Sequence, residues 1–219
     1  MRNGSFLICF TGVDGSGKTT HAKFLKKYLE EQGYSCRYVW GASRPFFSYF
    51  FFVLTRVLGY WTNTKKNAYT DPLEYAPRLF VKNLGKVWHL FIFIDYQLKA
   101  LVKIRLPLLV GKVVICDRYF YDFLMEIRLS NVSSKKFTSV ISKGMPKPLV
   151  TFLMDIPETL AKNRRNFSYE FFSKRNEVFL DLAENFNFRV IDSSETLLGN
   201  QRKIRQETLR RMQELESQG

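Results

Sequence analysis

The chain has 219 residues, of which 46% are hydrophobic and 25% charged, and its formal net charge at pH 7 is +14. This composition is ordinary for a soluble globular protein, and the length suits one α/β domain with a substantial core. The three cysteines form no CxxC pair, which disfavours a disulfide framework and a zinc site.

The first apolar run covers residues 6–10. It is followed too soon by Asp14 and Lys18 to be the apolar region of a signal peptide. We therefore expect a cytoplasmic protein whose thiols are reduced and mostly buried.

Short, continuously apolar runs alternate along the chain with longer helical patterns, which is typical of a parallel sheet with crossover helices. Strands are predicted at residues 6–11, 36–40, 113–116, 149–154 and 188–191. Helices are predicted near residues 18–32, 71–103, 119–127, 157–163, 173–185 and 199–216. No repeat or linker interrupts these elements, so we expect a single domain over residues 1–219.

The segment 46–61 is rich in aromatic residues. It is shorter than the roughly 20 apolar residues of a membrane-spanning helix, and it carries Arg56 and Gly59. The sequence favours a buried or dimer-interface helix, with contact to a membrane surface as the alternative. A transmembrane segment is not expected.

The pattern G-x-x-x-x-G-K-[ST] is met by residues 12–19, between a predicted strand and a predicted helix. In this phosphate-binding loop, glycines let successive backbone N–H groups point at an anion near a helix N-terminus. Lys18 is expected to reach the β- and γ-phosphates, and Thr19 to offer its hydroxyl to a magnesium ion. The loop predicts an ATP site. The residues assigned to it are Gly12, Asp14, Gly15, Ser16, Gly17, Lys18, Thr19 and Thr20.

A second motif, Asp117-Arg118-Tyr119, follows the strand predicted at 113–116. Open α/β sheets bind ligands at the carboxyl ends of their strands, so Asp117 is expected to join Thr19 in holding magnesium. The planar guanidinium of Arg118 suits contact with phosphates. The alternative for this dipeptide is a surface ion pair that caps a helix.

The basic residues are spread along the chain in pairs rather than gathered in one tail. No nucleic-acid motif accompanies them, so the +14 charge favours a nucleotide enzyme over a nucleic-acid or membrane partner without excluding either.

The phosphate-binding loop, with Thr20 after it and Asp117-Arg118-Tyr119 later in the chain, resembles the thymidylate kinase family. Segments 107–112, 153–158 and 43–45 are also similar to stretches of that family. The resemblance implies the P-loop NTPase fold, with a five-stranded parallel sheet flanked by helices and a short basic lid at about 163–175. It also implies a homodimer that moves the γ-phosphoryl of ATP onto dTMP.

The resemblance further assigns roles to individual residues. The family's matching carboxylate, here Asp14, sits near the acceptor, and its matching arginine, here Arg44, orients the acceptor phosphate. Arg118 would lie between the two nucleotides. The implied catalytic set is Lys18, Arg118, Arg164 and Arg165; the implied acceptor set is Asp14, Arg44, Phe93, Tyr96, Arg118 and Tyr119.

The chain departs from the family in the acceptor half of the site. Thr11 stands where the family usually has a carboxylate, and Ile92 and Tyr96 stand where a phenylalanine and an arginine hold the acceptor. Phe93 or Phe91 could stack on the base instead, and Lys99 could supply the missing charge, although none of them is at the matching position. Asp122 would suit an acceptor rich in hydroxyl groups.

Three hypotheses about function follow from these matches and departures. The first is a kinase acting on dTMP. The second keeps the fold and the ATP chemistry with another acceptor: a different nucleotide, a nucleoside, a sugar or a polynucleotide end. The third is a nucleotide-binding module without turnover.

Overall fold

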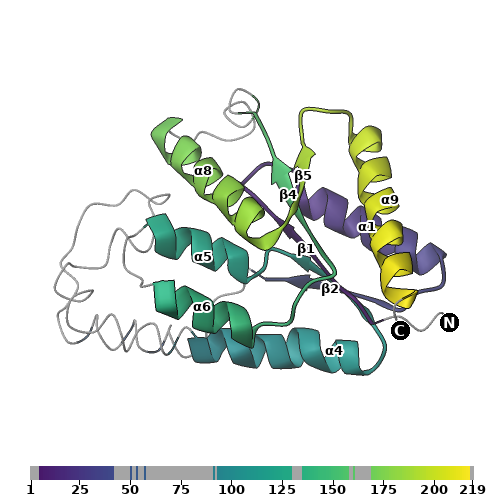
Figure 1. The fold of residues 1–219 in the computed structure, drawn as a ribbon, viewed down its shortest axis with the longest axis horizontal. Coiled ribbons are helices and arrows are strands. Elements are labelled where there is room, and N and C mark those ends of the chain that lie inside the picture. Colours follow the sequence, from purple (N-terminus) through teal and green to yellow (C-terminus); the bar gives the residue numbers. More distant parts are fainter. Residues whose placement is uncertain are drawn as a thin grey trace.

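A computed structural model describes residues 5–41, 50, 53, 57, 91, 93–129, 135–157, 160 and 169–217 of the chain. Five parallel strands form one sheet in the order β2-β3-β1-β4-β5 (Figure 1). The strands are β1 (Leu7–Thr11), β2 (Cys36–Trp40), β3 (Val113–Asp117), β4 (Val150–Asp155) and β5 (Arg189–Asp192). The helices are α1 (Lys18–Glu31), η1 (Leu101–Arg105), α4 (Leu106–Leu109), α5 (Phe120–Leu129), α6 (Lys135–Gly144), α8 (Tyr169–Phe186) and α9 (Leu197–Glu216).

The two faces of the sheet carry separate hydrophobic cores. On one face, α1 and α9 pack over Ile8 and Phe10 of β1, while Leu7 and Cys9 of the same strand point into the other core. That second core is covered by α5, α6, α8 and the helix that runs from residue 93 through η1 and α4 (Figure 1). This alternation within β1 explains why its sequence is apolar at every position.

The central and edge strands differ in burial as the sheet order requires. Every residue of β1 and β3 is buried, whereas β2 and β5 at the two edges expose several side chains. The five predicted strands are confirmed to within one residue at each end, and the predicted fold class is confirmed with them.

The helix predicted at 71–103 is confirmed over residues 93–103, and it continues to Leu109, six residues beyond the predicted end. Pro107 has no N–H for a helical hydrogen bond, which normally stops or bends a helix. Here the turn just before it is widened: the N–H of Leu106 donates to the carbonyl of Leu101, five residues back. The π-turn η1 thus carries the helix past a proline.

The remaining helix predictions had mixed outcomes. The helices predicted at 18–32, 119–127, 173–185 and 199–216 are confirmed, with shifted ends. Helix α6 was not predicted: it is only ten residues long, and its helical spacing is carried by three apolar residues, Phe137, Val140 and Ile141. The predictions for 71–90 and most of 46–61 and 157–163 lie outside the described residues.

None of the helices in the described part of the chain has both the length and the apolar character needed to cross a membrane.

Candidate active site

The phosphate-binding loop leaves β1 and enters α1 at the carboxyl edge of the sheet. Gly12 has a φ of +133°, and a Cβ built on it would lie 2.6 Å from the backbone oxygen of Met154. Both the conformation and the space therefore require glycine at this position. Gly17, with a φ of +92°, caps α1 and turns the chain into the helix.

Lys18 lies inside this loop. Its side chain is buried, and its ammonium Nζ donates to the backbone oxygens of Gly12 and Val13 at 2.8 Å and 2.6 Å. The loop is also held by the residue after β5, since the Ser193 hydroxyl donates to the Ser16 carbonyl at 3.0 Å. A cation fixed beside a helix N-terminus is an arrangement that attracts phosphate.

Asp117, the last residue of β3, faces the start of α1. Its oxygen Oδ2 accepts hydrogen bonds from the Thr19 hydroxyl at 2.5 Å and from the Tyr38 hydroxyl at 2.7 Å. Burial and the neighbouring Asp117 carboxylate together raise the pKa of Tyr38, so this phenol stays protonated and can donate.

The other oxygen of Asp117, Oδ1, is buried and has no hydrogen-bond partner among the described residues. A buried carboxylate oxygen without a partner is costly, and a cation or its bound water is the usual compensation. The donor set also fits magnesium, which prefers oxygen ligands and normally takes most of them from water and substrate phosphates. Thr19 and Asp117 could therefore hold Mg²⁺. No cluster of three or more His, Cys, Asp or Glu side chains that could hold a metal ion occurs in the described ranges.

Arg118 follows Asp117 in the left-handed region, with a φ of +68°. This conformation costs a non-glycine residue about 1–3 kcal/mol and needs support from its surroundings. Gly41 provides part of that support: its N–H donates to the Asp117 carbonyl at 2.8 Å. A Cβ on Gly41 would come within 1.9 Å of the Arg118 oxygen, so the contact requires glycine.

The Arg118 guanidinium joins two carboxylates from different elements. Nη2 pairs with Asp14 of the phosphate-binding loop, and Nη1 pairs with Asp122 of α5 at 2.9 Å. A planar cation is thereby held at the mouth of the loop, where the charge of a transferring phosphoryl group would develop.

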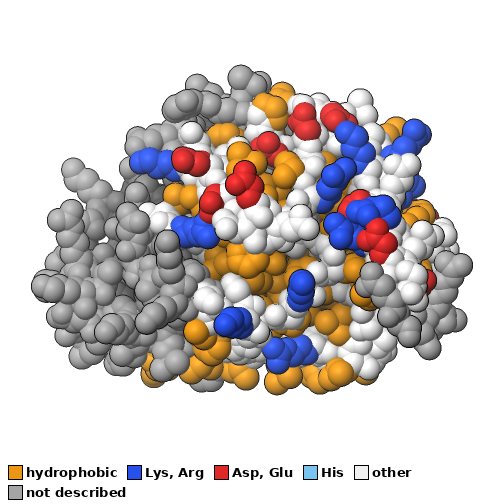
Figure 2. Space-filling model, in the orientation of Figure 1, with side chains coloured by type: hydrophobic (Ala, Val, Ile, Leu, Met, Phe, Trp, Pro, Cys, Tyr) orange, Lys and Arg blue, Asp and Glu red, His pale blue; other side chains and the backbone are white. Residues whose placement is uncertain are grey.

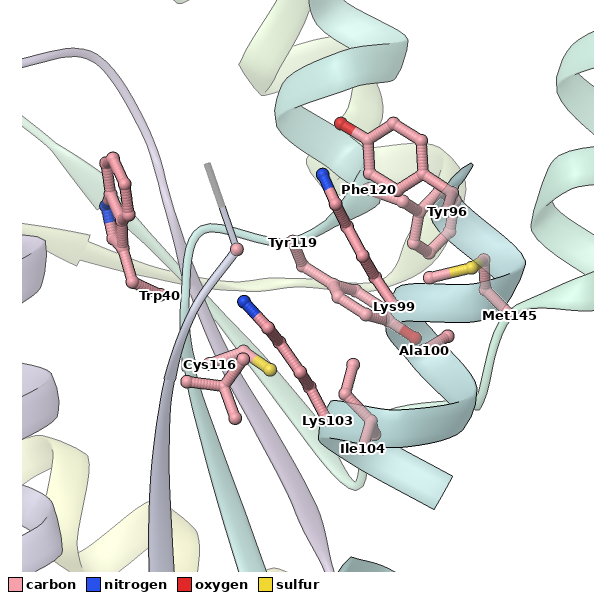
Figure 3. Close-up of a pocket in the computed structure, with 12 residues that line it drawn as sticks. Trp40, Tyr96, Lys99, Ala100, Lys103, Ile104, Cys116, Tyr119, Phe120 and Met145 are labelled. Atoms are coloured by element: carbon pink, nitrogen blue, oxygen red, sulfur yellow. The ribbon is translucent and has the colours of Figure 1, made fainter. Parts of the chain in front are cut away.

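A small pocket lies beside the turn that carries this arginine, since Gly41, Cys116 and Tyr119 line it. It is bounded by the end of β2, by the turn after β3 and by the helix over residues 93–109 (Figure 3). Tyr96, Lys99 and Lys103 line it from that helix, and Trp40 and Tyr119 line it from the other sides. Both lysine side chains extend from the helix into the pocket (Figure 3).

Lys99 and Lys103 make this pocket basic, while the aromatic and aliphatic residues around them make the rest of its lining apolar. Burial lowers the pKa of Lys99, and the neighbouring charge of Lys103 lowers it further, while Asp95 opposes the shift. The two ammonium groups lie one helical turn apart and place positive charge on this side of the pocket.

The structure brings the donor residues of the prediction together: Lys18, Thr19, Asp117 and Arg118 meet at one edge of the sheet. For the acceptor set, Tyr96 and Tyr119 line the pocket, and the Tyr119 hydroxyl donates to the carbonyl of Pro146 at 2.7 Å. Phe93 packs against the core instead of lining the pocket. Arg44, Arg164 and Arg165 lie outside the described residues.

The two oxygens of Asp122 accept hydrogen bonds from Thr11, from Arg118 and from the Tyr119 N–H. Tyr38 and Lys103 were not predicted from the sequence. Lys103 stands one helical turn after Lys99, and that spacing could have revealed it. Tyr38 gave no local signal.

Comparisons with known proteins bear on this site. The chain matches no protein-family profile. It is 27% identical to a probable thymidylate kinase of Pyrococcus abyssi over 206 residues, covering 86% of this chain and 88% of the relative. It is 27% identical to the thymidylate kinase of Bartonella quintana over 214 residues, with the same coverage. The chain is a distant homologue of the thymidylate kinases.

The fold agrees with this assignment. A crystal structure of thymidylate kinase from Ehrlichia chaffeensis superimposes with a TM-score of 0.54 over 86% of each chain, at 21% identity. The protein is accordingly a P-loop kinase that resembles thymidylate kinase. The homology places it among kinases of nucleoside monophosphates.

Proposed function

We propose that the protein transfers the γ-phosphoryl group of magnesium-bound ATP to dTMP, forming dTDP, within a single domain that spans residues 1–219. The observation that carries this proposal is the meeting of Lys18, Thr19 and Asp117 beside Arg118, with a lysine-lined pocket next to them. Relatives named as thymidylate kinases support dTMP as the acceptor.

Positioning and charge neutralisation would supply the catalysis in this site. The loop N–H groups and Lys18 would hold the β- and γ-phosphates, and the Arg118 guanidinium would face the group being transferred. Magnesium, when bound at Thr19 and Asp117, would neutralise phosphate charge. Arg44 and the lid at about 163–175, with Arg164 and Arg165, are proposed to complete the site.

The pocket beside Arg118 is the proposed acceptor site. A monophosphate carries the negative charge that Lys99 and Lys103 would balance, and Trp40, Tyr96 and Tyr119 offer apolar surface for a base or sugar. The lysine pair would thus take the part of the arginine that the family has and this chain lacks.

The lysine pair gives a specific expectation. Replacing both lysines, Lys99→Gln with Lys103→Gln, should raise the KM for the acceptor by at least about tenfold, because two charge-assisted contacts are lost. The KM for ATP should change by less than about twofold. Initial rates at varied acceptor and at varied ATP separate the two constants.

Lys23→Gln with Lys27→Gln provides a matched control, since both lysines are exposed, lie four residues apart on α1 and are absent from the pocket lining. This pair removes the same two charges from another helix and should leave both constants unchanged. An unaltered acceptor KM in the lysine double variant would place the acceptor phosphate elsewhere.

An acceptor panel with radiolabelled ATP tests the function itself. Incubation with dTMP, other nucleoside monophosphates, nucleosides, sugars and polynucleotide 5′ ends should label dTMP most efficiently. Label on another acceptor with none on dTMP would favour the second hypothesis. ATP binding without label on any acceptor would favour a non-catalytic module.

We also propose a cytoplasmic homodimer. The helix that ends in η1 and α4 presents a row of exposed apolar side chains at the spacing of one helical face. Hydrophobic side chains are visible along the lower edge of the molecule in Figure 2, where Figure 1 places α4. The row consists of Ile94, Leu98, Leu101, Val102, Leu106, Leu109 and Val110. Such a row is unusual on a monomer surface and suits contact with a second copy.

Substitution of Leu109 by glutamate tests the dimer. The Leu109 side chain is 79% exposed, so the change should not disturb folding. A dimer that uses this face should dissociate at micromolar concentration when a charge is buried in it. Sedimentation velocity of the wild type and of Leu109→Glu gives the result, and equal masses for the two proteins would exclude this face as the interface.

A further inference from the structure

Asp122 collects three donors around one buried carboxylate. Oδ2 accepts the Thr11 hydroxyl at 2.9 Å and the backbone N–H of Tyr119 at 3.3 Å. Oδ1 accepts Nη1 of Arg118 at 2.9 Å. The carboxylate therefore links the last residue of β1, the first turn of α5 and the arginine that faces the phosphate-binding loop.

The two carboxylates that share Arg118 are not equivalent. The Asp14 side chain is 37% exposed, whereas the Asp122 side chain is 12% exposed. Water screens the first ion pair more than the second. Asp122 is also fixed by its contacts with Thr11 and with the N–H of Tyr119 at the start of α5. The Nη1 side of the Arg118 guanidinium, which binds Asp122, is therefore anchored. The opposite edge, Nη2, points at the loop.

We infer that Asp122 is a positioning residue for Arg118, which holds the guanidinium at the mouth of the phosphate-binding loop before the nucleotides bind. A flexible charged side chain contributes more to a transition state when its orientation is set in advance. The inference rests on the proposed contact of Arg118 with the transferred phosphoryl group, and it does not depend on which acceptor is used.

A simpler role for Asp122 would be to cap α5, because a side chain at this helix position can accept the N–H of the capping residue. Asparagine can make that contact as well as aspartate. Asp122→Asn therefore keeps an acceptor oxygen for Thr11 and Tyr119, and it removes the charge that holds Arg118. This substitution separates positioning from capping.

The experiment is a double-mutant cycle of Asp122→Asn with Arg118→Ala, assayed by radiolabelled ATP with the best acceptor of the panel. Asp122→Asn alone should lower kcat at least about tenfold and leave the KM for ATP within about twofold. In the Arg118→Ala background it should cause no further loss. An equal loss in both backgrounds, or no loss in either, would overturn the inference.

Asp181→Asn is the matched control. Asp181 of α8 pairs on the surface with Arg128 of α5, the helix that also carries Asp122. Its substitution therefore removes one carboxylate from another ion pair of α5. It should leave kcat unchanged. If Asp122→Asn does not fold, Thr11→Val removes one donor to Asp122 and should give a smaller loss that again vanishes without Arg118.

An NMR measurement on the full chain tests the same inference without a kinase assay. The Nε–Hε signal of Arg118, assigned by its disappearance in Arg118→Lys, should be sharp in the wild type and broadened or shifted in Asp122→Asn. An identical signal in the two proteins would contradict the positioning role even if kinase activity falls. If instead dTMP is not phosphorylated while the Arg118 signal changes as expected, the positioning role of Asp122 stands and the proposed acceptor is wrong.

Discussion

Lys18→Ala is expected to lower phosphoryl transfer to every acceptor by at least about 100-fold. The Lys18 ammonium lies within the phosphate-binding loop, on the carbonyl oxygens of Gly12 and Val13. A phosphate that enters the loop would meet this cation in a site largely shielded from water, where charge stabilisation is strongest. The loss should appear in kcat with any acceptor, because the donor half of the site is common to all of them.

The measurement is the initial rate of ADP formation that depends on the acceptor, with Lys23→Ala as the control. Lys23 is an exposed residue of the same helix, and its loss removes an identical charge. Circular dichroism should show that both variants are folded. Substantial activity in Lys18→Ala would mean that the nucleotide phosphates bind somewhere else.

The second large effect is expected for Asp117→Asn, which should lower kcat at least about 100-fold at ordinary magnesium concentrations. The substitution keeps the size of the side chain and the contacts with Thr19 and Tyr38, but it removes the charge behind the buried oxygen Oδ1. Raising the magnesium concentration should restore part of the activity.

Stability should respond to Asp117→Asn in the opposite direction. A buried carboxylate oxygen without a partner costs free energy in the folded protein, so the melting temperature of the variant, without nucleotide, should stay equal or rise. A purely structural Asp117 would lose stability on substitution. Unchanged activity over a magnesium titration would remove Asp117 from the proposed metal site.

The parts of the structure that sequence could predict are those set by local patterns. The strands are short apolar runs covered on both faces, and the phosphate-binding loop joins one of them to a helix within a few residues. Helix α6 escaped prediction because it is short, although Phe137, Val140 and Ile141 recur in it at helical spacing and Ile141 is fully buried.

The contacts that sequence could not predict join distant residues. Thr11 and Asp122 are 111 positions apart, and Tyr38 and Asp117 are 79 apart, so no spacing rule relates them. The sheet order brings β3 between β1 and β2, and only this arrangement makes these hydrogen bonds possible. The pocket arises in the same way, since Trp40 and Lys99 come from separate elements.

The most direct test of the proposed function is the stoichiometry of one reaction, ATP with dTMP, followed by ³¹P NMR. ADP and dTDP should form in equal amounts, both should require magnesium, and neither should form with Lys18→Ala. Formation of ADP and inorganic phosphate without dTDP would contradict the proposed function.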